Sequence, residues 1–198
     1  MADTICDFTA VTRRLDSFSG LADVPPQGVP VQDPLVVPPI DLPRQAVVAA
    51  VSAIAEPLRS SILHTVDIAL ELHGTKYGAT VSLSNGDMVG TKGFAVSIYP
   101  ERTVELTAPP KEHQLLAFVV ANLDVLLLPD RAMGTWYADT NRHVLDVVFC
   151  ARDQQTAAKL GKRSKQWSIY DLDLHREILI EDLDQTRALA CGEEVTTR

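Results

Sequence analysis

A long stretch without proline, from Gly134 to Leu179, constrains the fold of this chain most. It begins with two apolar segments, GTWYAD and HVLDVVFCA, which flank a polar turn at Thr140-Asn141-Arg142 and predict a β-hairpin. A helix is expected from about Asp153 to Arg163, with Asp153 as its N-cap. Strands over 166–172 and 177–180 are then expected to close the module. The pattern is typical of antiparallel strands with one helix, and it contains no recognisable catalytic motif.

Two longer helical segments precede this module. Apolar residues recur at three- and four-residue steps over 44–73, which predicts a helix that Gly74 ends. Pro57 lies inside this pattern and is expected to kink the helix or to divide it into two. A second helix is expected over 110–128, with Pro110 in its first turn. Its wide apolar surface predicts that it packs deeply against a sheet.

Three short strands are expected between these helices, over 79–83, 94–99 and 103–107. The Asn85-Gly86 pair predicts a hairpin between the first two strands. Together these elements predict an α+β fold, a mainly antiparallel sheet packed by two long helices. The expected domain covers residues 44–180, and a polar, acidic, flexible tail is expected over 181–198.

A proline-rich N-terminal arm, residues 1–43 and partly extended, is expected to precede the domain. Seven of the twelve prolines fall within 20–43: Pro25, Pro26, Pro30, Pro34, Pro38, Pro39 and Pro43. They exclude a long helix there. One interpretation is a semi-rigid spacer. We favour an arm that lays its many valines across a groove of its own domain or of a second subunit.

Composition limits the classes of function. At 198 residues and 46% hydrophobic, the chain suits one domain with an arm, and its net charge of −8 argues against broad attraction to nucleic acid. The strongest apolar run is broken by Asn122 and Asp124 and is too short for a membrane span. No secretory signal is visible, and three widely spaced cysteines suggest neither zinc nor disulfides, so a cytoplasmic protein without a cofactor is expected. Cys150 fits a small buried apolar residue.

Candidate binding residues are confined to the closing module. Its aromatic residues, which include Tyr170, fit a buried core with polar tips, or alternatively a recognition surface. Five basic residues with Asp153 give 151–166 a net charge of +4, whereas the chain from Asp171 onward carries −5. The basic segment is interpreted as a solvated helix face or as a docking site for phosphate or an acidic protein. The candidate binding residues are Trp136, Tyr137, Arg152, Lys159, Lys162, Arg163, Lys165 and Trp167.

The aspartates of this module are the weakest candidates for chemistry. Asp139, Asp146, Asp171 and Asp173, with His143, could form a metal or acid–base set. They come from separate strands and turns, where aspartate collects for ordinary structural reasons. No nucleophile elbow, HExxH sequence or nucleotide-binding glycine motif is present. No catalytic residue and no metal site are therefore assigned.

The order of motifs from Gly93 to about Glu177 carries a resemblance. GFAVSIYPER, a helix ending in LLLPD, GTWY, HVLDVVF, a basic helix and QWSIYDL follow one another. This order resembles a module of uncharacterised proteins of actinobacterial phages and mobile elements. The chain departs from it at Lys165-Gln166-Trp167, where the module has Asn-Gln-aliphatic. The resemblance implies a phage or prophage origin and an accessory role, and it brings no known activity.

These observations favour a non-enzymatic accessory protein that binds a host or viral protein in the host cytoplasm, and that also forms a homo-oligomer. One alternative is a small metal-dependent hydrolase or nucleic-acid-processing enzyme that uses the closing-module aspartates. A third interpretation is nucleic-acid binding through the basic helix over 152–165.

Overall fold

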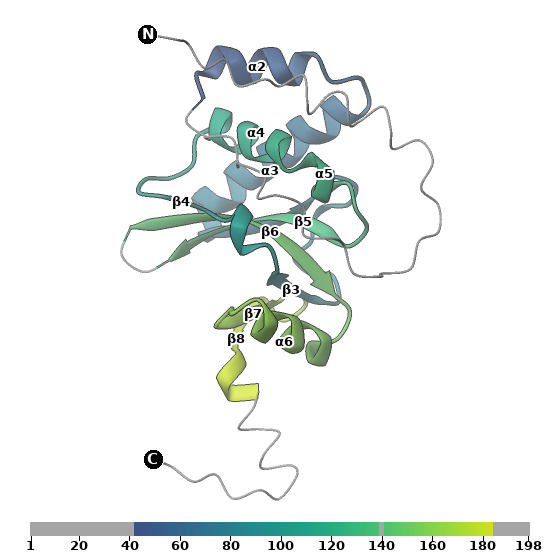
Figure 1. Ribbon diagram of the computed structural model, residues 1–198, viewed down its shortest axis with the longest axis vertical. Helices are drawn as coiled ribbons and strands as arrows, with labels where there is room; N and C mark the ends of the chain where they lie inside the picture. The colour runs from purple at the N-terminus through teal and green to yellow at the C-terminus, as the bar shows by residue number, and fades with distance from the viewer. Residues whose placement is uncertain (1–41, 139–140, 184–198) are drawn as a thin grey trace, which may run out of the picture.

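A computed structural model describes residues 42–138 and 141–183 (Figure 1). One layer of helices covers an antiparallel sheet, and a further helix packs lower down. The helices are α2 (Arg44–Ser52), α3 (Leu58–Lys76), α4 (Glu112–Ala121), α5 (Leu123–Leu126) and α6 (Gln154–Arg163), with a 3-10 turn η1 (Pro100–Arg102). The strands are β1 (Gly78–Ser82), β2 (Gly86–Asp87), β3 (Phe94–Ser97), β4 (Val104–Leu106), β5 (Arg131–Ala138), β6 (Arg142–Ala151), β7 (Ser168–Asp171) and β8 (Arg176–Leu179).

All pairings in the sheet are antiparallel, in the order β2-β1-β5-β6-β3-β7-β8. The long hairpin β5–β6 forms its centre, with Ala138 opposite Arg142 at the turn end. On its other side β6 is shared: β4 pairs with its first half, from His143 to Leu145, and β3 pairs with its second half, from Val148 on. Asp146 and Val147 lie in the gap between these two partners. The sheet therefore splits at the middle of its longest strand.

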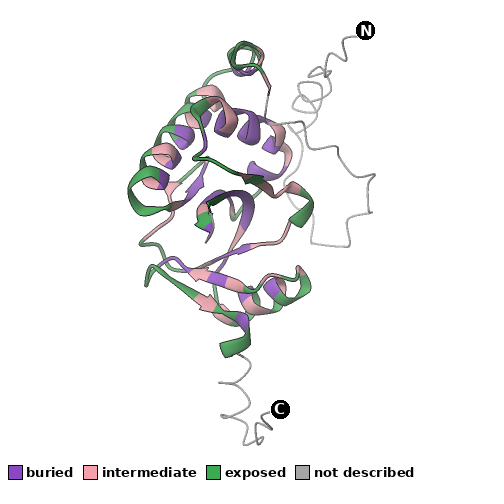
Figure 2. Ribbon diagram, turned by 90° about the vertical axis from the view of Figure 1, so that its left-hand side faces the viewer, coloured by how far each residue is buried: buried purple, intermediate pink, exposed green. Residues whose placement is uncertain are grey.

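Alternation along the strands gives the sheet a helix face and an opposite face. On the helix face, Met133, Leu145 and Val147 are fully buried against α3 and α4. Phe118 and Ile62 contribute the largest side chains of this core. Figure 2 shows buried positions on the sides of these helices that face the sheet and exposed positions on the outer sides. The apolar surface predicted for residues 110–128 is thus buried as expected from Leu115 to Leu126, whereas Leu127 and Leu128 are exposed.

Helix α6 closes a second, smaller core lower on the sheet. Ala157 of α6 packs with Val96 and Ile169 of β3 and β7. The helix begins as predicted, because the Asp153 carboxylate accepts a hydrogen bond from the backbone N–H of Thr156 at 2.8 Å. Gly161 gives the helix a close approach to the strand layer, since a Cβ there would lie 2.6 Å from Ile180 Cδ1.

Three local predictions need correction. The strands over 79–83 and 94–99 do not form a hairpin: β1 pairs with the short β2 and with β5, and β3 pairs with β6 and β7. Gly74 does not end its helix, which continues to Lys76 and is capped by Tyr77 in the left-handed conformation (φ 63°). The helix over 110–128 divides at Asn122, whose side-chain amide donates to the Phe118 carbonyl oxygen at 2.8 Å.

The predicted α+β class is confirmed, with an antiparallel sheet and helices packed on it. Pro57 divides the first helical segment into α2 and α3, one of the two outcomes expected of it. The arm over residues 1–41 and the tail over 184–198 lie outside the described residues. Within residues 42–138 and 141–183, no helix is both long enough and apolar enough to cross a lipid bilayer.

Candidate functional site

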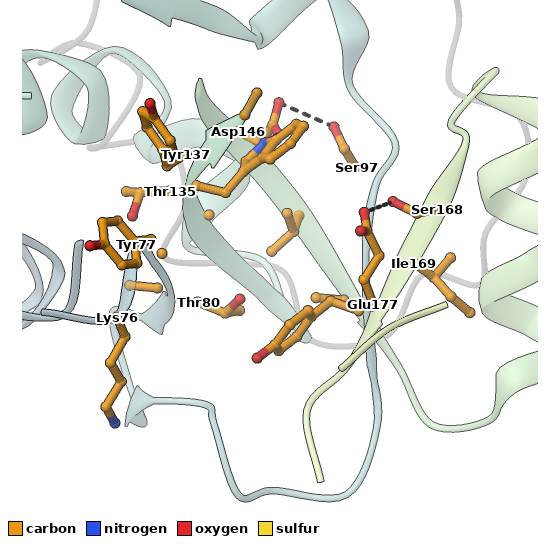
Figure 3. Close-up of a pocket in the computed structure, with 18 of the residues that line it drawn as sticks. Lys76, Tyr77, Thr80, Ser97, Thr135, Tyr137, Asp146, Ser168, Ile169 and Glu177 are labelled. Carbon is orange, nitrogen blue, oxygen red and sulfur yellow. Dashed lines mark hydrogen bonds between the residues drawn. The ribbon is translucent and has the colours of Figure 1, made fainter. Parts of the chain in front are cut away.

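A pocket of about 590 Å³ is lined by residues of β1, β3, β5, β6, β7 and β8 and by the C-terminal end of α3 (Figure 3). Thr80 of β1 and Tyr170 of β7 both line it, although three strands separate β1 from β7 in the sheet. The sheet must therefore curl around the pocket. Two backbone hydrogen bonds join the loop after β2 to the end of β7, Gly90 N–H to the Leu172 carbonyl oxygen at 2.7 Å and Leu172 N–H to the Gly93 carbonyl oxygen at 3.0 Å.

Small side chains leave the space that forms the pocket. Ala95 and Gly134 lie in its lining next to Val148, where a larger residue would fill it. At Gly134 an added Cβ would lie only 3.0 Å from Val148 Cγ1, so the Val148 side chain occupies the space beside this glycine. Pockets of this volume that combine apolar walls with a few polar groups are typical of binding sites.

Aromatic rings surround this space. Trp136 and Trp167 come from β5 and from the residue before β7, and their ring centroids are 6.4 Å apart. The Trp167 side chain is 58% exposed, which is unusual for so large an apolar group. Tyr77 and Tyr137 form a second aromatic pair, 6.0 Å apart, at the α3 end of the pocket, where the Tyr137 ring also lies 5.0 Å from the ring of His143. Tyr170 also lines the pocket.

Asp146 is the buried acidic residue of the pocket lining. One carboxylate oxygen accepts from the Thr103 hydroxyl at 2.6 Å and from the Ser97 hydroxyl at 3.3 Å, and the other accepts from Trp136 Nε1–H at 3.2 Å. Burial raises the pKa of this carboxyl, and the three hydrogen bonds act in the opposite direction. Asp146 lies on β6 between the residues that pair with β4 and those that pair with β3. Its hydrogen bonds therefore join β3, β5 and the segment before β4.

A second carboxylate lies on the far side of the pocket. Glu177 of β8 accepts a hydrogen bond from the Ser168 hydroxyl at 2.6 Å, as drawn in Figure 3. Glu177 is exposed, whereas Asp146 is 7% exposed. The pocket thus has one buried and one accessible acid.

The structure brings together three of the predicted binding residues, Trp136, Tyr137 and Trp167. The five basic candidates do not line this pocket. They lie on or beside α6, whose buried side packs against the second core, and each is exposed: Arg152, Lys159, Lys162, Arg163 and Lys165. The aromatic and basic candidates therefore form two separate surfaces.

The predicted acidic set does not converge. Asp146 and His143 point to opposite faces of β6, because they are three residues apart on one strand. One Asp171 oxygen accepts the backbone N–H groups of Asp173 and Leu174, which makes it a turn residue. Asp139 lies outside the described residues. Within the described part of the chain, no group of three His, Cys, Asp or Glu residues could hold a metal ion.

A pair of buried histidines lies on the helix face instead. His73 Nε2 and His143 Nδ1 are 2.7 Å apart, and His73 Nδ1 is 3.1 Å from the Thr135 hydroxyl. Burial, and then the proximity of His143, lower the pKa of His73. This network links the end of α3 to the central hairpin. No local sequence pattern predicts this network, since the two histidines are far apart along the chain.

Several pocket residues lie outside the set predicted from sequence. Tyr77, Ser97, Thr103 and Glu177 either line the pocket or bind Asp146. Alternation along β6 would have placed Asp146 and Val148 on one face. The pairing of β3 and β7 beside them could not be read from a local pattern.

Comparisons of the chain with protein-family models, with curated proteins and with solved structures gave no match. The arrangement of the site is therefore the basis for the function considered next.

Proposed function

We propose that this protein is a non-enzymatic accessory protein, encoded by a phage or a mobile element, which binds a host or viral protein through the aromatic pocket. The observation that carries this proposal is the gathering of Trp136, Tyr137 and Trp167 around one pocket of about 590 Å³. Tryptophan and tyrosine dominate the energetics of protein interfaces, especially where they flank a cavity that a partner can fill. The motif order from Gly93 to Glu177 supports the proposed origin.

The host cytoplasm is the proposed compartment, and a homo-oligomer the proposed assembly. Three cysteines without a pairing pattern support a reducing compartment. The valine-rich arm supports self-association, since a second copy would provide a groove for it.

The test is capture of proteins from host lysate by the full chain and by variants, followed by mass spectrometry. Trp167→Ala removes an exposed ring of the pocket and is expected to lower capture of the specific partner at least tenfold, in line with about 2 kcal/mol or more for an interface hot spot. Leu174→Ala is the matched control, because Leu174 is equally exposed at 61% but does not line the pocket. Equal capture by the Trp167→Ala and Leu174→Ala variants would contradict the proposal.

The exposed basic residues of α6 favour nucleic acid as a second candidate ligand. A double variant, Lys159→Glu with Arg163→Glu, separates the two surfaces. The proposal expects this variant to capture the protein partner as the wild type does. A mobility shift of DNA or RNA that is strong at low salt and lost in this double variant would support the second candidate instead.

A further inference from the structure

The two acidic residues of the pocket lining, Asp146 on β6 and Glu177 on β8, have no ion-pair partner among the described residues. Asp146 and Glu177 bind hydroxyl and indole donors, and neither forms an ion pair within residues 42–138 and 141–183. The pKa of the Tyr170 phenol is raised, first by burial and then by the negative charges of Asp87 and Asp171. The exposed Glu177 carboxylate, which is in no ion pair among the described residues, gives this side of the pocket negative charge.

The basic residues of the lining form no ion pair with these two acids. Lys76 points away from the pocket in Figure 3. Arg142 is paired with Glu105 at 3.2 Å on the exposed edge formed by β4 and β6. His175, the third basic residue of the lining, lies in the exposed turn between β7 and β8. The two acids of the pocket can therefore interact with a bound cationic group.

The aromatic rings of the pocket also favour a positively charged group. The face of an indole or phenol ring attracts a cation through its quadrupole, by about 0.5–2 kcal/mol depending on exposure. Trp136 is held in place by its hydrogen bond to Asp146, so its ring presents a fixed face without a loss of side-chain freedom on binding. Trp167 lies beside it with its side chain mostly exposed.

We infer that the group which enters this pocket is a cationic side chain of the protein partner, a lysine ammonium or an arginine guanidinium, held against the aromatic rings with Glu177 beside it. This inference rests on the proposed function and names the chemistry of the guest. An uncharged apolar guest would gain the same burial but would leave Glu177 without a counter-charge.

The test is NMR titration of the ¹⁵N-labelled full chain with short blocked peptides, Gly-Lys-Gly and Gly-Arg-Gly, and their norleucine and glutamate equivalents. The chain has two tryptophans, so its two indole N–H signals are assigned by a single Trp167→Phe variant. The lysine and arginine peptides are expected to shift both indole signals in a saturable way. The norleucine peptide, which has the same stem without the charge, is expected to bind at least about threefold more weakly. The glutamate peptide is expected not to bind.

Glu177→Gln keeps a hydrogen-bond acceptor for Ser168 and removes the charge, and it is expected to weaken lysine-peptide binding by about threefold. The matched control is Glu112→Gln, the same change on α4, which packs on the opposite sheet face. This control should leave the affinity for the lysine peptide unchanged. Equal binding of the norleucine peptide, no binding of any peptide, or equal effects of the two substitutions would overturn the inference.

The two proposals fail in different ways. If partner capture depends on Trp167 while the norleucine peptide binds as well as the lysine peptide, the protein-binding proposal stands and the cationic guest is wrong. If the lysine peptide binds as expected while partner capture is unaffected by Trp167→Ala, the cation site stands and the proposed function is wrong.

Discussion

Asp146 lies where β6 passes from one neighbouring strand to another, and its carboxylate compensates for the ladder hydrogen bonds missing at the gap. It accepts from Ser97 at the end of β3, from Thr103 before β4 and from Trp136 on β5. A charged carboxylate loses its hydration when it is buried, and no cation compensates for that loss here. Burial therefore raises the pKa of Asp146. The three donors offset that cost. One residue thus stabilises the split sheet and fixes a pocket ring.

We expect Asp146→Ala to destabilise the fold by about 2 kcal/mol or more, because it leaves buried donors without an acceptor. Asp146→Asn should cost less, since its amide oxygen still accepts a hydrogen bond and the buried charge is gone. Chemical denaturation of the two variants measures this order. An Asn variant that is no more stable than the Ala variant would contradict the role of Asp146 as a hydrogen-bond acceptor.

The buried histidine pair predicts a pH dependence of stability. The pKa of His73 is lower in the folded protein than its ordinary value near 6.5. Below about pH 6.5 the unfolded chain therefore binds more protons at this residue than the folded protein does. The free energy of unfolding should therefore fall as pH drops below about 6.5 towards the folded pKa. His73→Gln should flatten this slope, as measured by thermal melting between pH 7.5 and 5.

His64→Gln is the control for this measurement, because His64 is an exposed residue of the same helix. It should leave the slope as in the wild type. Identical pH profiles for the wild type and the His73→Gln variant would show that the histidine pair is not the titrating group.

At the scale of elements, local patterns predicted single strands and helices but not their partners. The Asp153 N-cap, the division at Pro57 and the β5–β6 hairpin follow from residues that are neighbours in sequence. The Asn85-Gly86 turn is real, yet the strand after it has two residues and β3 pairs elsewhere. Strand pairing depends on burial across the whole sheet, which no short window of sequence contains.

Helix α6 provides a quantitative test at this scale. Asp153→Ala removes the oxygens that accept from the Thr156 backbone N–H and from its hydroxyl, and it should cost about 0.5–2 kcal/mol of stability. Gln155→Ala, on the same exposed turn, should be close to neutral. Denaturation midpoints of the two variants measure the difference, and equal values would contradict the capping role.

At the scale of the whole molecule, the two sheet faces have different roles. The helix face holds the main core, and the opposite face keeps a pocket because small residues line it. Sequence reasoning identified Trp136, Tyr137 and Trp167 but grouped them with the basic residues of α6. Strand β3 separates these two sets, because Val96 faces α6 while Ala95 lines the pocket. The position of β3 arises from long-range pairing that the aromatic and charge patterns do not encode.

The central claim is that partner binding uses the aromatic pocket and not the basic helix. Its most direct measurement is chemical-shift mapping of the labelled chain with the captured partner. The account predicts that the indole signals of Trp136 and Trp167 and the amides around Glu177 are perturbed, while those of Lys159 and Arg163 stay in place. Perturbation centred on α6 with both indole signals unchanged would contradict it.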